Sequence, residues 1–231
     1  MTVEAIILAG GFGTRLREII SDVPKPMALI AGRPFLEILL GNLEKKGFKR
    51  IILSLGYKAD KVITHFGSKF RNMELSYEVE HSPLGTGGAV RASLMHCRSN
   101  HVFVFNGDTF LDLETSEIEA LWVANQNPII VAREVQDTLR YGRIYDDGGY
   151  VGELIDKGVA GPGLINAGCY LLPTHVLDSY ELGQVFSLEA DFLRMYIQKT
   201  PVELFVSKGY FIDIGIPSDY QRAQIELPKF F

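Results

Sequence analysis

The chain has 231 residues, a net charge of −5 and two cysteines. This length suits one domain that buries roughly 70% of its unfolded surface, and the negative charge argues against a nucleic-acid partner, whose phosphates need a basic face. With no apolar run of the roughly 18 residues that a membrane span requires, no secretory signal and two distant cysteines, we expect a cytoplasmic protein without a disulfide framework.

Apolar segments alternate with helical patterns along the chain, as expected of an α/β protein. Strands are predicted at residues 3–9, 50–55, 75–80, 102–105 and 129–131, and helices at 34–46, 59–66, 89–96 and 118–125. Beyond Gly142 the predicted strands are shorter, at 143–146, 151–155 and 164–172, and glycines separate them. We expect these later strands to extend the sheet.

The first strand leads into a loop that contains Gly10, Gly11 and Gly13. Three glycines where a strand meets a helix leave backbone N–H groups open to phosphate oxygens. Arg15 and Lys25 add two positive charges, and the prolines on both sides of Lys25 stiffen its segment. The spacing fits neither the dinucleotide fingerprint nor the Walker loop. The loop therefore predicts polyphosphate binding, and a glycine turn that merely ends the strand is the alternative.

Two aspartates stand beside short strands. Asp108 follows the strand at 102–105 and the permissive Gly107, and Asp213 lies on a second short strand before Gly215. Open α/β sheets place ligands at the carboxyl ends of their strands. Two carboxylates, with phosphate oxygens and waters, make a Mg²⁺ site. Taken alone, each aspartate is equally compatible with a turn or cap.

Together these motifs resemble the sugar-1-phosphate nucleotidyltransferase family. The matching segments follow in the family's order: 9–16, 24–27, Pro83-Leu84-Gly85-Thr86-Gly87-Gly88-Ala89, Asn106-Gly107-Asp108, Asp156-Lys157, Asn166-Ala167-Gly168 and Phe211-Ile212-Asp213-Ile214-Gly215. Within the family, segments 17–22, 24–27, 32–37, 141–142 and 211–220 resemble the enzymes that guanylylate D-glycero-α-D-manno-heptose 1-phosphate.

The resemblance implies a fold and a domain plan. The expected fold is an α/β three-layer sandwich, glycosyltransferase-A-like, with a mostly parallel, Rossmann-like sheet and a small sugar-side lobe. Residues 1–231 are expected to form a single nucleotidyltransferase domain. Its nucleotide-binding half covers about residues 1–135, and the half with the sugar site and the second metal ligand covers about 136–231.

The resemblance also implies a Mg²⁺-assisted in-line attack of the sugar phosphate on the α-phosphate of GTP. The products are GDP-heptose, for surface polysaccharides such as lipopolysaccharide or capsule, and pyrophosphate. Arg15 is expected to hold the β- and γ-phosphates, Lys25 to contact the α-phosphate, and Asp108, with Asp213, to bind the metal. The attacking phosphate is already ionised near neutral pH, so we expect positioning and charge neutralisation rather than a general base.

Further residues are expected to bind the two substrates. The nucleotide-binding residues are Leu8, Ala9, Gly10, Gly11, Gly13, Thr14, Arg15, Lys25, Glu80, Pro83, Gly85, Thr86, Asn106 and Gly107. The sugar-phosphate residues are Tyr141, Gly142, Asp156, Lys157 and Asn166. Asp156 is one methylene shorter than the glutamate of the family pattern, and Gly158 stands where that pattern has proline.

Glu80 favours GTP, because a carboxylate accepts from guanine N1–H and the amino group, whereas relatives that use thymidylyl or uridylyl groups commonly place glutamine near this position. A solvent-facing Glu80 is the alternative. Three other readings stay open: uridylyl or cytidylyl transfer, guanylyl transfer to another sugar such as mannose 1-phosphate, and a non-catalytic paralogue that binds an NDP-sugar. Neither nucleic acid nor membrane is an expected partner, and the family resemblance is compatible with a homodimer or homotetramer.

Overall fold

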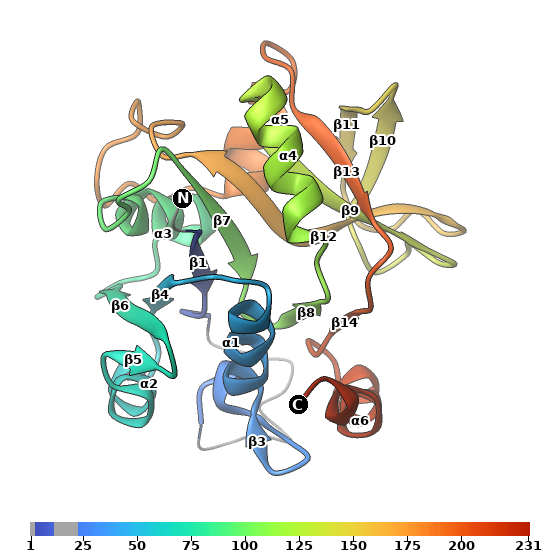
Figure 1. Cartoon of the computed structure of the whole chain (residues 1–231). Helices are drawn as coiled ribbons and strands as arrows, with labels where there is room; N and C mark the ends of the chain where they lie inside the picture. Colours follow the sequence, from blue (N-terminus) through green and yellow to red (C-terminus); the bar gives the residue numbers. More distant parts are fainter. Residues whose placement is uncertain (1–2, 12–22) are drawn as a thin grey trace.

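The computed structural model describes residues 3–11 and 23–231 (Figure 1). Its main sheet is built from β1 (Glu4–Leu8), β4 (Arg50–Leu55), β5 (Lys69–Phe70), β6 (Met73–Val79), β7 (His101–Asn106), β9 (Ile129–Val135), β10 (Arg143–Asp147), β11 (Tyr150–Ile155), β12 (Gly163–Pro173) and β13 (Glu203–Ser207). Within the described residues these ten strands follow the order β10–β11–β13–β9–β12–β7–β1–β4–β6–β5.

The sheet is parallel on one side and mixed on the other. Strands β6, β4, β1 and β7 run parallel, with Ile6 opposite both Ile52 and Val104. β12 then runs antiparallel to β7 and β9, and β10 pairs antiparallel with β11 and β12. The predicted parallel arrangement therefore describes the run β6–β4–β1–β7. Beyond it the sheet is mixed: the short connection between β10 and β11 produces an antiparallel pair, whereas β13 runs antiparallel to β11 and parallel to β9.

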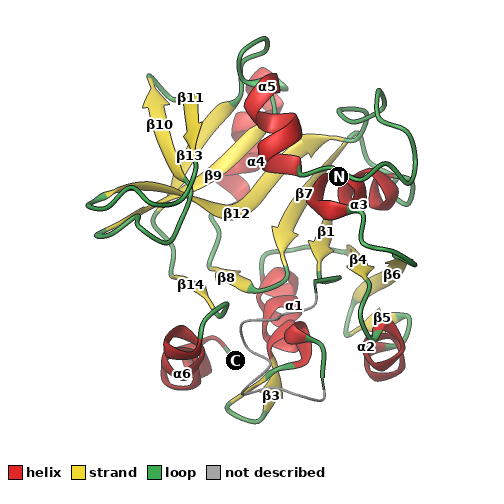
Figure 2. Ribbon diagram, turned by 180° about the vertical axis from the view of Figure 1, so that it is seen from behind, coloured by secondary structure: helices red, strands yellow, loops and turns green. Residues whose placement is uncertain are grey.

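Helices cover both faces of the sheet, so the predicted three-layer α/β sandwich is confirmed (Figure 2). Helices α1 (Phe35–Lys45), α2 (Ala59–Phe66) and α4 (Thr115–Asn125) pack on the face that carries Ile7 and Leu53. Helix α3 (Gly85–Leu94), the π-helical turn η3 (Leu188–Leu193) and α5 (Arg194–Tyr196) cover the face that carries Ile6 and Ile52. Strands β1, β4 and β7 are thus buried on both faces, which explains why apolar residues dominate them, whereas β6, nearer the edge of the sheet, is only partly buried.

A third apolar cluster lies where the chain returns to the carboxyl ends of the parallel strands. Helix α1 contributes to it together with β2 (Leu29–Ile30), β8 (Thr109–Leu111), β14 (Phe211–Asp213), α6 (Pro217–Glu226) and η4 (Leu227–Phe230). The short elements η2 (Lys25–Met27) and β3 (Arg33–Pro34) flank β2 along the chain. Buried Ile30, Phe110 and Ile212 pack together in this cluster. The Tyr220 hydroxyl of α6 donates to the Leu29 carbonyl at 2.7 Å, which fastens the helix to the β2–β3 hairpin. No described helix is long and apolar enough to cross a bilayer.

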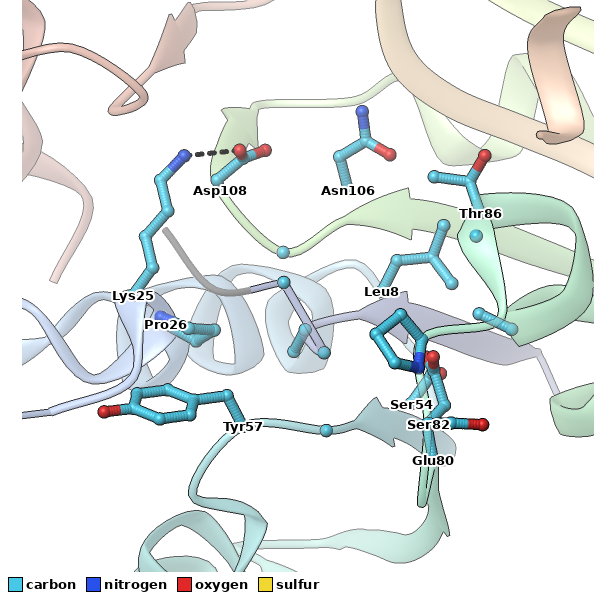
Figure 3. A pocket seen from close by; sticks show the side chains of 18 of the residues that line it. Leu8, Lys25, Pro26, Ser54, Tyr57, Glu80, Ser82, Thr86, Asn106 and Asp108 are labelled. Atoms are coloured by element: carbon cyan, nitrogen blue, oxygen red, sulfur yellow. Dashed lines mark hydrogen bonds and ion pairs between the residues drawn. The ribbon is translucent and has the colours of Figure 1, made fainter. Parts of the chain in front are cut away.

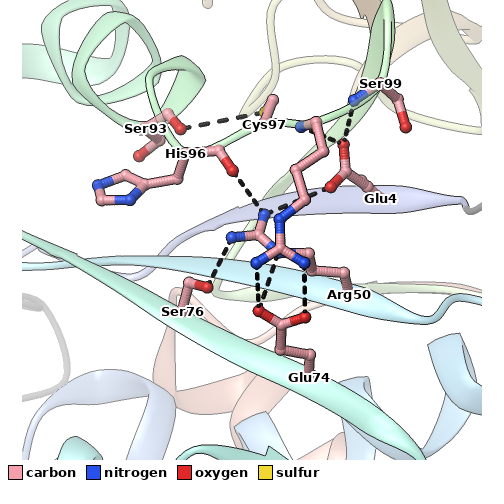
Figure 4. A network of polar contacts seen from close by, with 9 residues as sticks. Glu4, Arg50, Glu74, Ser76, Ser93, His96, Cys97 and Ser99 are labelled. Carbon is pink, nitrogen blue, oxygen red and sulfur yellow. Dashed lines mark hydrogen bonds and ion pairs between the residues drawn. The ribbon is translucent and has the colours of Figure 1, made fainter.

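At the amino ends of the parallel strands, charged side chains form ion pairs and hydrogen bonds with one another (Figure 4). Arg50, only 5% exposed, donates to Glu4 at 3.3 Å and to the His96 carbonyl at 2.7 Å. Glu4 also accepts the backbone N–H groups of Arg98 and Ser99 at 2.9 and 2.8 Å. Buried charges are tolerated when they are paired and hydrogen-bonded, so this network ties the amino ends of β1 and β4 together.

Candidate active site

A cavity of about 580 Å³ opens at the carboxyl ends of β1, β4 and β7 (Figure 3). Lys25 and Asp108 lie at one end of the cavity, and Glu80 lies at the other. The described residues that were predicted to bind nucleotide all line it: Leu8, Ala9, Gly10, Gly11, Lys25, Glu80, Pro83, Gly85, Thr86, Asn106 and Gly107. The predicted residues Gly13, Thr14 and Arg15 lie outside the described part of the chain.

Close backbone contacts form the floor of this cavity. The Gly107 N–H donates to the Leu8 carbonyl at 2.9 Å, and a Cβ at Gly107 would lie 2.5 Å from that oxygen. A Cβ at Gly10 would lie 2.9 Å from Oε1 of Glu80. Only glycine fits such approaches without displacing its neighbours. The loops after β1 and β7 therefore meet directly and present main-chain atoms to the cavity.

Glu80 is turned toward the cavity rather than toward solvent. Its Oε2 accepts the Leu84 N–H at 2.9 Å, while Oε1 faces Gly10. Burial raises the pKa of Glu80, and the hydrogen bond from the Leu84 amide opposes that rise. A half-buried carboxylate at the edge of a cavity is suited to accept hydrogen bonds from a planar base.

The other end of the cavity holds a short ion pair. Lys25 Nζ lies 2.5 Å from Asp108 Oδ2, and the two side chains are 11% and 34% exposed. Strand β14 pairs with β8 so that Asp213 stands opposite Thr109, next to Asp108. The Ile214 N–H also donates to the Asp108 carbonyl at 3.0 Å. This pairing holds Asp213 next to Asp108 in the fold.

The chemistry of this donor set fits Mg²⁺, which takes one or two carboxylates and fills its other positions with water or phosphate oxygens. Within residues 3–11 and 23–231 there is no group of three or more His, Cys, Asp or Glu placed to hold a metal. A metal held by Asp108 and Asp213 would therefore take further ligands from the substrate or from water.

A second cavity, of about 390 Å³, adjoins the first and shares Asn106 and Asp108 with it. The residues predicted for the sugar phosphate all line it, and so does Asp213: Tyr141, Gly142, Asp156, Lys157, Asn166 and Asp213. The pairing of β10 with β12 explains part of this convergence, since the Asn166 N–H donates to the Gly142 carbonyl at 3.3 Å. The register of β12 against β9 shifts between Asn166 and Cys169, as at a β-bulge, and Asn166, Gly168 and Tyr170 of this stretch line the cavity.

The model of the family described as nucleotidyl transferase matches residues 4–229. The chain belongs to this family. A D-glycero-alpha-D-manno-heptose 1-phosphate guanylyltransferase of Campylobacter jejuni is 39% identical over 96% of this chain and 99% of its own length. The enzyme of the same name from Aneurinibacillus thermoaerophilus is 36% identical over 99% of this chain and 100% of its own length.

Solved structures agree with the sequence relatives. The crystal structure of HddC from Yersinia pseudotuberculosis superposes with a TM-score of 0.88, at 39% identity and full coverage of both chains. The same protein complexed with GMP-PN superposes with a TM-score of 0.87. This nucleotidyl transferase thus has the fold of a full-length relative of known structure.

Several residues that line the second cavity of this nucleotidyl transferase were not predicted from the sequence, among them Tyr170, Glu189 and Arg194. Arg194 Nη2 lies 2.7 Å from Asp156 Oδ1, and these side chains are 41% and 82% exposed. Glu189 and Arg194 come from η3 and α5, which carry no motif of their own. Only the packing of this segment against α3 and β12 brings them to the cavity.

The glycines at 85, 87 and 88 also have a packing role. The N–H groups of Gly87 and Gly88 both donate to the Phe186 carbonyl, at 2.9 and 3.4 Å. Added Cβ atoms at Gly85, Gly87 and Gly88 would overlap Phe186 or Gln184. The glycines therefore allow residues 184–186 to lie directly against the first turn of α3, which begins at Gly85.

We expect Gly87→Ala to destabilise the protein, although replacing glycine by alanine inside a helix normally stabilises by about 1 kcal/mol. The reason is the overlap of the new methyl group with the Phe186 ring. The matched control is Gly41→Ala in α1, where an added Cβ meets nothing within 4 Å and the normal stabilisation is expected. Urea denaturation measures both changes in the free energy of unfolding. An equal stabilisation in both variants would contradict the assigned contact.

Proposed function

We propose that this chain transfers the guanylyl group of GTP to D-glycero-α-D-manno-heptose 1-phosphate, releasing pyrophosphate and GDP-heptose. The observation that carries the proposal is the pair of adjoining cavities that share Asn106 and Asp108. The names of the two full-length relatives and the GMP-PN complex of HddC support the choice of substrates. The reaction would take place in the cytoplasm, where GTP is available, and its product would supply surface polysaccharide assembly.

The reaction forms one bond and breaks another at the α-phosphorus. A phosphate oxygen of the sugar 1-phosphate attacks the α-phosphorus of GTP, the α–β phosphoanhydride bond breaks, and pyrophosphate leaves with its electron pair. The attacking oxygen needs no deprotonation, so the protein contributes positioning and charge. Lys25, at the junction of the two cavities beside Asp108, would neutralise charge that builds on the α-phosphate. Arg15 would act on the leaving pyrophosphate.

Asp108 and Asp213 would hold a Mg²⁺ ion, which when bound neutralises phosphate charge and orients the phosphoryl groups. Both side chains line the cavity on the sugar side, and Asp108 lines both cavities. Until metal and phosphates bind, Lys25 supplies the positive partner of Asp108. The same lysine would then turn to the α-phosphate when the carboxylate binds its metal.

The base would lie at the Glu80 end of the first cavity, with N1–H and the amino group of guanine donating to the carboxylate. In the second cavity, Lys157 would contact the phosphate of the sugar, and Asn166 and Asp156 its hydroxyl groups. The pairing of Asp156 with Arg194 gives this wall an exposed acceptor next to an exposed donor. Such a pair suits two neighbouring hydroxyl groups, each of which donates and accepts.

The first test measures pyrophosphate release with Mg²⁺, using each of the four NTPs against heptose 1-phosphate and mannose 1-phosphate. We expect release with GTP and the heptose, at a kcat/KM at least ten-fold above every other pair. Release with another pair would retain the reaction and change the substrates. No release with any pair would favour a non-catalytic NDP-sugar-binding protein.

Asp108→Asn is expected to lower kcat at least a hundred-fold while the fold is retained, because the amide removes the charge proposed to hold the metal. The matched control is Asp112→Asn. Asp112 has the same 34% exposure and also pairs with a lysine, Lys46 at 2.6 Å, but it lies outside both cavities. Steady-state kinetics measures kcat of both variants, and circular dichroism checks that both retain the fold. Turnover of Asp108→Asn near that of the control would rule out the metal role.

Glu80→Gln is expected to raise KM for GTP about ten-fold or more and to change kcat little. The rise reflects the loss of hydrogen bonds to a charged acceptor. Because burial raises the pKa of Glu80, lowering the pH protonates this acceptor first, so KM for GTP should rise as the pH falls. That pH dependence should disappear in the variant. Glu78→Gln on the same strand, whose carboxylate pairs with His96 outside the cavity, is the control. Equal GTP affinity in both variants would remove Glu80 from base recognition.

A further inference from the structure

Glu189 joins the walls of the two cavities through its carboxylate. Oε2 accepts the Thr86 hydroxyl at 2.9 Å and the Ser187 hydroxyl at 3.2 Å. Oε1 accepts the Tyr170 hydroxyl at 2.8 Å. Thr86 lines the first cavity, whereas Glu189 and Tyr170 line the second. Thr86 also accepts the Leu188 N–H at 2.9 Å, so its hydroxyl proton and one of its two acceptor positions are used within the protein.

The surroundings of Tyr170 decide which group donates in each hydrogen bond of this series. Tyr170 is fully buried, and burial together with the nearby Glu189 charge raises its pKa well above the ordinary value. The hydroxyl therefore keeps its proton and donates it to Glu189. Its oxygen is left to accept from Asn166 Nδ2, which lies 2.7 Å away.

The Asn166 amide is thus fixed from two sides. The Gly168 N–H, which can only donate, points at Asn166 Oδ1 at 2.9 Å, so the amide nitrogen must face Tyr170. In this orientation Asn166 keeps one N–H donor and one acceptor position for a ligand in the second cavity. Reversing the amide would place donor against donor at Gly168.

We propose that Glu189 is a positioning residue for the sugar: through Tyr170 it fixes the orientation of the Asn166 amide, and through Thr86 it anchors that wall to the nucleotide cavity. The inference rests on the proposed function, because it takes the ligand of the second cavity to be a sugar 1-phosphate. It adds a requirement that Asn166 alone does not reveal. The sugar contact depends on an acceptor from a segment 23 residues further along the chain.

The test uses Tyr170→Phe, Glu189→Gln and the double variant. Tyr170→Phe keeps the ring and removes only the oxygen that orients Asn166. We expect KM for the sugar 1-phosphate to rise about ten-fold, which corresponds to the loss of one hydrogen bond. KM for GTP should stay within two-fold of the wild-type value. Because Glu189 and Tyr170 act in series on Asn166, the double variant should lie within about two-fold of the larger single effect. Tyr145→Phe, on the exposed side of β10 and outside both cavities, is the control.

A rise confined to the sugar KM, with a less than multiplicative double variant, supports the inference. Unchanged sugar KM, multiplicative effects, or equal loss of both substrates together with a lowered Tm would overturn it in favour of a purely structural tie. The wild-type protein separates this outcome from failure of the proposed function. If it neither turns over nor binds a sugar 1-phosphate in calorimetry, the function itself is wrong, and the variants are then not needed.

Discussion

The site depends on one pairing between segments far apart in the chain, that of β14 with β8. It sets Asp213 opposite Thr109 and lets Ile214 donate to the carbonyl of Asp108 at 3.0 Å, so two carboxylates from distant segments share one location. The ladder is only three residues long on each strand. Its stability comes from the apolar cluster around Phe110 and Ile212, both fully buried, and from α6, which presses on the same cluster. Packing outside the cavities thus fixes the positions of the two carboxylates.

Charged side chains are satisfied differently at the amino ends and at the carboxyl ends of the parallel strands. At the amino edge, Arg50 and Glu4 use their hydrogen-bonding groups on each other and on nearby backbone, which stabilises the fold and leaves little for a ligand. At the carboxyl edge, glycines bring loops so close that main-chain atoms form the cavity floor, while Lys25, Asp108 and Glu80 are only partly covered. A charged substrate can supply further hydrogen-bond and ion-pair partners to such partly exposed polar groups.

The fold was predictable where a single segment carries its own signal. Strand β4 and helix α2 match their predicted bounds, because unbroken apolar runs and helical spacing are local properties. Helix α3 begins four residues before the predicted start at 89, because its glycines serve a contact with Phe186 that no local pattern shows. The same limit explains why Glu189 and Arg194 were missed. Their place in the second cavity is decided by packing against residues about a hundred and about forty positions away, respectively.

The division of the site into two cavities has a consequence for how it selects substrates. The first cavity lies at the ends of parallel strands and is lined in part by glycines, which under the proposed function would suit the phosphates that every nucleoside triphosphate shares, with Glu80 at the end where the base would lie. The second cavity is formed by the antiparallel part of the sheet, and its Asp156–Arg194 pair lies exposed. Exposed ion pairs are worth little on their own, so this pair can change partners at small cost when hydroxyl groups arrive. The part-buried hydrogen bonds that link Thr86, Glu189, Tyr170 and Asn166 have less freedom, because each group is held by a partner within the protein. They would therefore set the geometry within which the exposed pair adjusts.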